Sequence, residues 1–180
     1  MNDTITGESS MQEVLQIFPG AQRALFRKYH IGGCSSCGFR PDETLAGVCE
    51  RNGDLPVGEV LEKIQQSHDE DARILLEPAD LAKRLANGEN IRLVDIRSRE
   101  EFEAVHIKDA VLLTQPLMQE ILGSWDNEQR FVMIDHQGQK GLDAAAYYLG
   151  HGMPNVHALR GGIDAWSLEV DSSIRRYTLS

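Results

Sequence analysis

Two short apolar runs constrain the fold of this chain more than any other feature. They are IRLVDI at residues 91–96 and FVMID at residues 131–135. Each is nearly continuous in apolar side chains, which is typical of strands buried on both faces of a parallel sheet. From residue 74 onwards, such runs alternate with amphipathic helical patterns. The alternation predicts a three-layer α/β domain with a mostly parallel sheet and right-handed crossovers over residues 74–180.

The apolar spacing also predicts where the elements of this domain lie. We expect strands at residues 73–77, 91–96, 110–113, 131–135 and 156–159, and helices at residues 79–87, 99–104, 116–123, 141–151 and 161–166.

The first part of the chain has a different pattern, with helical spacing and no strand signal. Ser10 is the expected N-cap of a first helix, and Glu13 is its capping-box partner. Residues 1–9 are expected to be a flexible tail, residues 10–66 a small all-α domain, and residues 67–73 (SHDEDAR) a charged linker without apolar periodicity. Helices of the small domain are expected at residues 11–18, 21–30, 43–51 and 56–66.

The charge balance excludes two classes of function. The chain has 28 acidic and 18 basic side chains, a formal net charge of −10. Such a surface disfavours nucleic acids and anionic membranes as partners. No apolar run approaches the roughly 20 residues that span a bilayer, and the polar start MNDTITGESS does not resemble a signal peptide. We therefore expect a cytoplasmic protein, whose three cysteines do not form a disulfide framework.

The segment FVMIDHQGQKGLDAAAYYLG, residues 131–150, reads as a strand, a tight loop with a glycine and a helix. A loop that leads from a buried strand into a helix presents backbone N–H groups to an anion. Such loops usually surround a nucleophile or a phosphate, but here the first loop residue is Asp135. If those N–H groups hold the carboxylate, the pKa of Asp135 should lie below the ~3.9 of a free aspartate.

Several spaced motifs in this domain resemble the rhodanese family of sulfurtransferases. LVDIRSREEFEAVHIKDA resembles the first half of a rhodanese domain, and NVHALRGGIDAW resembles its closing segment. The matching positions are Asp95, Arg97, Glu101, Phe102, His106, Ile107, Ala110, Gly161, Gly162, Ile163 and Trp166. The resemblance implies the rhodanese-like fold, with His106 in a structural role. It weakens at residues 105–110, where VHIKDA replaces the usual Gly-His-Ile-Pro-Gly-Ala.

The resemblance also implies a changed active-site loop. Active members of the family begin this loop with a cysteine that becomes a persulfide, and the cysteine position is Asp135 here. The degenerate loop consists of Asp135, His136, Gln137, Gly138, Gln139 and Lys140. Lys140 replaces a common arginine and lacks its planar fork. A carboxylate cannot form a persulfide, so conventional sulfurtransferase activity is not expected. Asp135 then acts as a structural loop cap, as part of a ligand- or partner-binding surface, or in a new aspartyl chemistry. The last is disfavoured because no acidic cluster for Mg²⁺ accompanies it.

The cysteines are the second group of candidate functional residues. Cys34 and Cys37 form a Cys-x-x-Cys pair flanked by glycines, and Cys49 lies in the next helix. Such a pair can form a disulfide or provide two ligands to one metal. The segment resembles the small helical domain associated with hybrid-cluster proteins and redox disulfides. That resemblance implies thiol redox chemistry, or an iron–sulfur cluster or zinc, at Cys34 and Cys37. Cys49 is either a third ligand or a packing residue.

Three thiolates are one fewer than the usual four ligands of such a site. Either His30 or a homodimer sharing the cluster could complete the set. From these features we expect an accessory protein of sulfur or iron–sulfur metabolism that docks a protein partner through an inactive rhodanese-like domain. Two alternatives stay open: an active sulfurtransferase with the persulfide on Cys34 or Cys37, and a purely structural interaction module.

Overall fold

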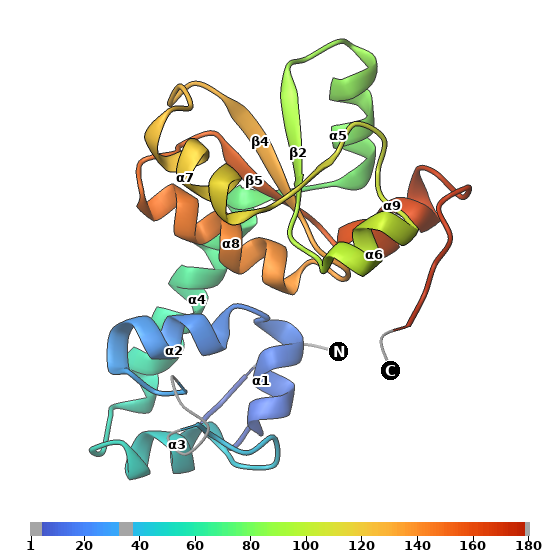
Figure 1. The fold of residues 1–180 in the computed structure, drawn as a ribbon. Coiled ribbons are helices and arrows are strands. Elements are labelled where there is room, and N and C mark those ends of the chain that lie inside the picture. Colours follow the sequence, from blue (N-terminus) through green and yellow to red (C-terminus); the bar gives the residue numbers. More distant parts are fainter. Residues whose placement is uncertain (1–4, 33–37, 179–180) are drawn as a thin grey trace. The chain divides into compact units, whose positions relative to one another are not determined.

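The structure, a computed structural model, describes residues 5–32 and 38–178. The chain forms two compact units, Met1–Ala72 and Arg73–Ser180, which we call the helical unit and the α/β unit. Figure 1 shows the order of the elements along the chain. Within the described ranges, no helix is both long and apolar enough to cross a lipid bilayer.

Four helices pack around one apolar core in the helical unit. They are α1 (Met11–Ile17), α2 (Ala21–Tyr29), α3 (Leu45–Arg51) and α4 (Val57–Ile74). The expected capping box is present, with Ser10 and Glu13 bonded to each other's backbone N–H groups. The buried core consists of Met11, Val14, Ala21, Leu25, Ile31, Leu45, Val48, Cys49, Val60 and Ile64.

Two sequence-based boundaries in this unit are wrong. The expected linker, residues 67–73, is the last part of α4. It continues the helix because Ile64, His68 and Asp71 recur on one helical face. The His68 ring packs against Phe18 of the chain after α1, and Asp71 is buried and paired with Arg23 of α2. These contacts, and not apolar periodicity, keep the segment helical.

The expected flexible tail is also partly ordered. Among residues 5–9, the carbonyl groups of Gly7 and Ser9 accept hydrogen bonds from the N–H groups of Ala46 (2.8 Å) and Leu45 (2.9 Å). These two donors lie at the start of α3, where a helix has no carbonyl of its own to offer them. The segment is therefore held in place, because its carbonyl groups accept hydrogen bonds from N–H groups at the start of α3 that have no partner within the helix.

The α/β unit confirms the predicted fold class. Its strands are β1 (Leu75–Leu76), β2 (Ile91–Asp95), β3 (Val111–Leu112), β4 (Arg130–Ile134) and β5 (Val156–Leu159). Its helices are α5 (Pro78–Ala86), α6 (Arg99–Ala104), α7 (Gln115–Gly123), α8 (Gln139–Gly150) and α9 (Gly162–Glu169). The strands form one sheet in the order β1-β5-β4-β2-β3, and all of its pairs are parallel.

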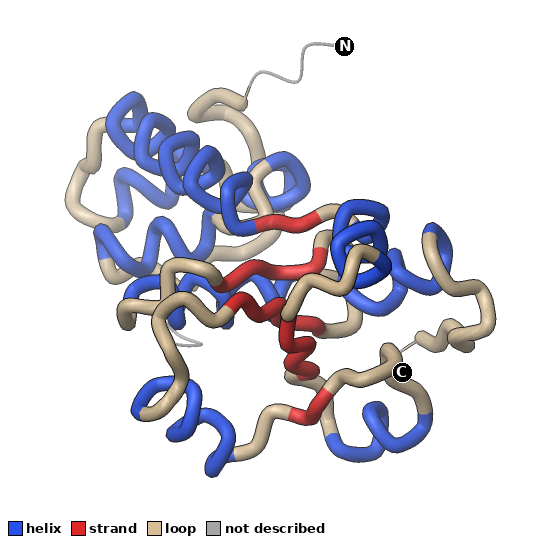
Figure 2. Tube along the Cα trace, turned by 90° about the horizontal axis from the view of Figure 1, so that it is seen from above, coloured by secondary structure: helices blue, strands red, loops and turns tan. Residues whose placement is uncertain are grey.

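Helices cover both faces of this sheet, as Figure 2 shows from above. On one face, Val94, Phe131 and Met133 pack with side chains of α7 and α8. On the other face, Leu93, Val132 and Ile134 pack with side chains of α5 and α9. Successive strand residues therefore enter opposite layers, which explains why the runs at β2 and β4 are continuously apolar.

The sheet register determines where polar groups meet. Asp95, the last residue of β2, is paired in register with Ile134, the last residue of β4. The loops after these two central strands consequently emerge side by side at the carboxyl edge of the sheet. Open α/β sheets usually bind ligands at that edge, so the chain after Asp95 and the chain after Ile134 form the candidate site.

Candidate functional site

The loop after β4 is shaped by glycines on two segments. Gly138 has φ of 94° and precedes α8. A Cβ atom at this position would lie 2.6 Å from the backbone nitrogen of Gly161. Gly162 has φ of 60°, and a Cβ atom there would lie 2.4 Å from the Asp135 carbonyl oxygen. Glycine is therefore needed at Gly162, the first residue of α9, and the backbone of Gly161, its N-cap, also packs directly against the loop.

Backbone hydrogen bonds join the loop to the start of α9. The N–H of Ile163 donates to the Asp135 carbonyl (2.9 Å), and the N–H of Asp164 donates to the His136 carbonyl (3.1 Å). Both donors belong to the first turn of α9, whose N–H groups have no partner within the helix. The loop conformation is thus fixed from outside as well as by its own glycine.

Asp135 fills the anion-binding position of its own loop. Its side chain is buried, and the residue is 5% exposed. Oδ1 accepts a hydrogen bond from the N–H of Gly138 (2.7 Å), and Oδ2 accepts one from the N–H of Lys140 (3.0 Å). The N–H groups that a loop of this shape would offer to an external anion are therefore directed at a carboxylate of the chain itself.

The sequence-based expectation for the ionisation of Asp135 is wrong. Burial raises the pKa of Asp135 above its ordinary value, although the N–H groups of Gly138, Gly141 and Lys140 act to lower it. The expectation counted those N–H groups but could not weigh the cost of removing a charged carboxylate from water. In this loop the desolvation of the carboxylate is the larger effect.

A buried ion pair forms the neighbouring wall of the site. Arg97 Nη2 lies 2.6 Å from Asp95 Oδ2, with side-chain exposures of 2% and 0%. Asp95 Oδ1 also accepts from the backbone N–H of Arg97 (3.0 Å), and Arg97 Nη2 donates to the Val105 carbonyl (2.7 Å). These bonds give both charges several partners, which a buried ion pair requires. The Asp-x-Arg motif thus holds the loop after β2 in place.

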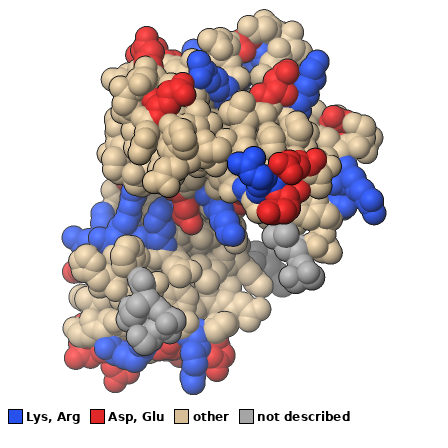
Figure 3. Space-filling view, in the orientation of Figure 1, with Lys and Arg blue, Asp and Glu red and all other residues tan. Residues whose placement is uncertain are grey.

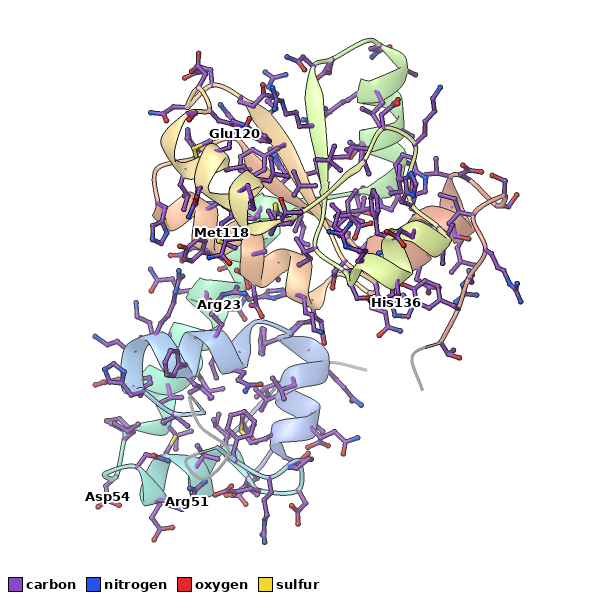
Figure 4. All side chains as sticks on the ribbon, viewed as in Figure 1. Arg23, Arg51, Asp54, Met118, Glu120 and His136 are labelled. Carbon is purple, nitrogen blue, oxygen red and sulfur yellow. The ribbon has the colours of Figure 1, made fainter. Side chains whose placement is uncertain are left out.

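Tyr177, near the C-terminus, connects the two loops. Its hydroxyl accepts from Arg97 Nη1 (2.8 Å) and donates to Glu101 Oε1 (2.7 Å). Its backbone carbonyl accepts from Nε2 of His136 (3.0 Å). Figure 4 shows His136 beside α6, at the end of the sheet where this network lies. Sequence reasoning missed Tyr177, because no pattern near it signals a contact with residues more than seventy positions earlier.

A cavity of about 280 Å³ opens between the two loops. It is lined by Ile96, Arg97, Ser98, Glu101, Asp135, His136, Gln137, Gln139 and Lys140. All predicted loop residues except Gly138 line it. Gln137, Gln139 and Lys140 are exposed, whereas Gly138 is buried beneath the loop. The cavity therefore presents side-chain amides and an ammonium group above a carboxylate that is already hydrogen-bonded.

His106, for which the resemblance implies a structural role, makes local contacts at the end of α6. Its Nδ1 donates to the Phe102 carbonyl (2.8 Å), one helical turn earlier. Its ring stacks on the Phe102 ring with centroids 4.3 Å apart. Both contacts are local to the end of α6, outside the residues that line the cavity.

The structure places only one of the three cysteines. Cys34 and Cys37 lie outside the described residues. Cys49 is 2% exposed in the core of the helical unit, and burial raises the pKa of its thiol. His30, the suggested fourth ligand, ends α2 in a left-handed conformation with φ of 59°. Over the described part of the chain, no three His, Cys, Asp or Glu side chains are grouped to hold a metal ion. The surroundings of Cys49 favour its packing role.

Comparison with known proteins gives one family and several relatives. The profile of the family described as "Rhodanese-like domain" matches residues 77–169. The thiosulfate sulfurtransferase GlpE of Pseudomonas savastanoi pv. phaseolicola is 31% identical over 74 residues, covering 41% of this chain and 70% of the relative. A sulfurtransferase of Allochromatium vinosum is 33% identical over 92 residues, covering 51% and 86%. The solved human single-domain sulfurtransferase TSTD1 has 23% identity and a TM-score of 0.48, covering 53% and 96%.

Proposed function

Because the chain belongs to the rhodanese-like domain family, we propose that it is an accessory protein of sulfur or iron–sulfur metabolism. In this proposal the α/β unit binds a protein partner without transferring sulfur. Cys34 and Cys37 of the helical unit cycle between thiol and disulfide or bind a metal or cluster. The curated relatives named above are sulfurtransferases, which supports a role in sulfur metabolism at a general level.

The observation that carries this proposal is the environment of the Asp135 carboxylate. Sulfur transfer through a persulfide needs a thiolate that attacks the donor sulfur, and a carboxylate oxygen cannot replace it. The N–H groups of Gly138 and Lys140 already donate to Asp135. An incoming sulfur oxyanion would therefore meet the buried carboxyl group of Asp135. The N–H donors that could stabilise the charge of the oxyanion would already be occupied by that group.

The thiol part of the proposal rests on the spacing of Cys34 and Cys37 and on the environment of Cys49. A thiol that is 2% exposed and whose pKa is raised by burial is a poor nucleophile. We therefore assign the thiol chemistry of the proposal to Cys34 and Cys37, the pair in the glycine-flanked segment. Cys34→Ser and Cys37→Ser should reduce bound metal or redox cycling to the same extent, while Cys49→Ala should not.

A sulfur-transfer assay from thiosulfate to cyanide tests the inactive loop. The parent protein should show no transfer, and Asp135→Cys should gain some, because the same N–H groups would then face a thiolate. Adding Lys140→Arg should increase the rate, because the planar guanidinium group can bind an oxyanion through two hydrogen bonds. Asp126→Cys, on an exposed turn, is the matched control for a surface thiol and should stay inactive.

The outcomes separate the proposal from its alternatives. Robust transfer by the parent that survives Asp135→Ala and disappears in Cys34→Ser would establish a persulfide carrier on the helical unit and overturn the accessory role. Metal and sulfide analysis with an absorbance spectrum of anaerobically purified protein tests the thiols. A colourless, metal-free protein with unreactive thiols would favour a purely structural interaction module.

A further inference from the structure

A groove between α2 and α4 gathers cations in a chain that is otherwise acidic. It is lined by Ala24, Arg27 and Lys28 of α2 and by Lys63, Gln66, Ser67 and Glu70 of α4. The α2 sequence AQRALFRKY contains three basic side chains and no acidic one, although the whole chain has a formal net charge of −10. Figure 3 shows lysine and arginine side chains gathered over α2.

The cations of this groove have no carboxylate partner in the part of the chain that the structure describes. Other arginines are paired: Arg51 with Glu43, Arg160 with Glu77 and Glu169, and Arg176 with Asp164. By contrast, no described ion pair involves Arg27, Lys28 or Lys63, and Lys63 donates only to Gln66. Three cations and one carboxylate, Glu70, line the hollow. The positive charges exceed the negative one, so an anion that enters the hollow gains on balance.

The size of the groove indicates the kind of occupant. Its volume is about 190 Å³, below the roughly 300–1,000 Å³ of pockets that enclose a small-molecule ligand. The lining residues of α4 follow helical spacing along one face, so the groove is elongated between two helices. Gln66 and Ser67 offer neutral hydrogen-bonding groups beside the cations. These features suit side chains of a protein segment that lies along the surface.

We propose that the α2–α4 groove is a docking site for a short acidic segment, rich in Glu or Asp, of a partner protein. The local cations pair with carboxylates of that segment, and Gln66 and Ser67 bond to its polar groups. A nucleic acid is the less suitable occupant, because its charge extends over a length that would face the acidic remainder of the chain. The inference stands on the helical unit alone and does not depend on the state of the Asp135 loop.

A fluorescein-labelled polyglutamate peptide tests the groove by fluorescence anisotropy with the full chain. The parent should bind at about 20 mM salt and weaken steeply towards about 200 mM, because the interaction is between exposed charges. Arg27→Gln/Lys63→Gln should weaken binding about ten-fold. Lys83→Gln/Lys108→Gln removes the same charge from exposed positions of the α/β unit and should stay within about two-fold of the parent.

Each contrary result would overturn the inference. Equal weakening in both double variants would mean that net charge and not the groove governs binding. Displacement of the peptide by millimolar inorganic sulfate would identify a small-anion site. Tighter binding of a labelled single-stranded DNA of similar charge would identify a nucleic-acid site. Absence of parent binding at low salt would exclude the docking site, and circular dichroism of both variants verifies that each is folded.

Discussion

The imidazole of His136 stacks on the phenol ring of Tyr177, with centroids 4.4 Å apart and planes 10° from parallel. The same tyrosine bonds through its hydroxyl to Arg97 and Glu101. One residue near the C-terminus therefore connects the loop after β4, the loop after β2 and α6. The position of His136 at the candidate site depends on a side chain outside both loops.

Tyr177→Phe should destabilise the α/β unit while keeping the ring stack. The variant leaves Arg97 and Glu101 without the hydroxyl that joins them. Because water reaches this half-buried site, we expect a loss of about 1 kcal/mol in the free energy of unfolding, at the low end for bonds to charged groups. Tyr177→Ala should cost about 1 kcal/mol more, since it also removes the stacking on His136. Urea unfolding measures both.

Tyr147→Phe is the matched control for that series. Tyr147 is 44% exposed on α8, and its hydroxyl forms no hydrogen bond within the described residues. The substitution should change the free energy of unfolding by less than about 0.5 kcal/mol. If Tyr177→Phe proves as neutral as this control, the hydroxyl does not hold the two loops together.

The sequence predicts what is local and periodic in this protein. The continuous apolar runs located β2 and β4, and the alternation of strands with helices predicted the parallel sheet. The Ser10–Glu13 capping box was predictable because its partners are three residues apart. The site is less predictable. Contacts of Tyr177 join residues far apart in sequence, and the raised pKa of Asp135 depends on a burial that no local motif records.

The length of α4 shows the same limit. SHDEDAR lacks apolar spacing, so it was expected to end the helix. Its helical face is instead completed by the ring of His68 against Phe18 and by Asp71 against Arg23. A pattern of apolar residues alone cannot recognise a helix whose buried face includes an imidazole and a charged pair.

The free energy of unfolding should respond to pH through Asp135. The folded pKa of this carboxyl is raised above its ordinary value of 3.8, mainly by burial. Its contribution to stability is therefore fully present below that value and is lost as pH rises through the folded pKa. Asp135→Asn cannot ionise. The stability of the parent relative to Asp135→Asn should fall as pH rises above about 4 and through the folded pKa, measured by urea unfolding at each pH.

Asp135→Ala provides the internal check. It also lacks the titrating group, so its stability should change with pH in parallel with Asp135→Asn, whatever the offset between the two variants. The stability of the parent could instead rise relative to both variants as pH increases. That outcome would mean that the backbone N–H groups stabilise the carboxylate by more than its burial costs. That result would restore the depressed pKa expected from the sequence.

Gly138→Ala should lower the stability of the protein by more than the cost of placing an alanine in a left-handed conformation. Gly152 provides the comparison, because its φ of 89° is similar to the 94° of Gly138 but no atom lies within 4 Å of its added Cβ. Gly152→Ala should cost about 1–2 kcal/mol for the left-handed backbone alone. Gly138→Ala should cost at least about 2 kcal/mol more, because its Cβ meets the backbone of Gly161. Equal losses in thermal unfolding would show that the loop can move away.

Cys49 should behave as a core residue in both reactivity and stability. In the Cys34→Ser/Cys37→Ser protein, the remaining thiol is buried with a raised pKa. It should react with a thiol reagent such as dithionitrobenzoate only after unfolding in urea. Cys49→Ala should lose about 1–2 kcal/mol of stability for the removed sulfur, and Cys49→Ser should lose more, because a hydroxyl in this apolar core is costly to desolvate. Metal ligation by Cys49 predicts the reverse pattern: fast reaction in the folded protein and loss of bound metal in Cys49→Ala.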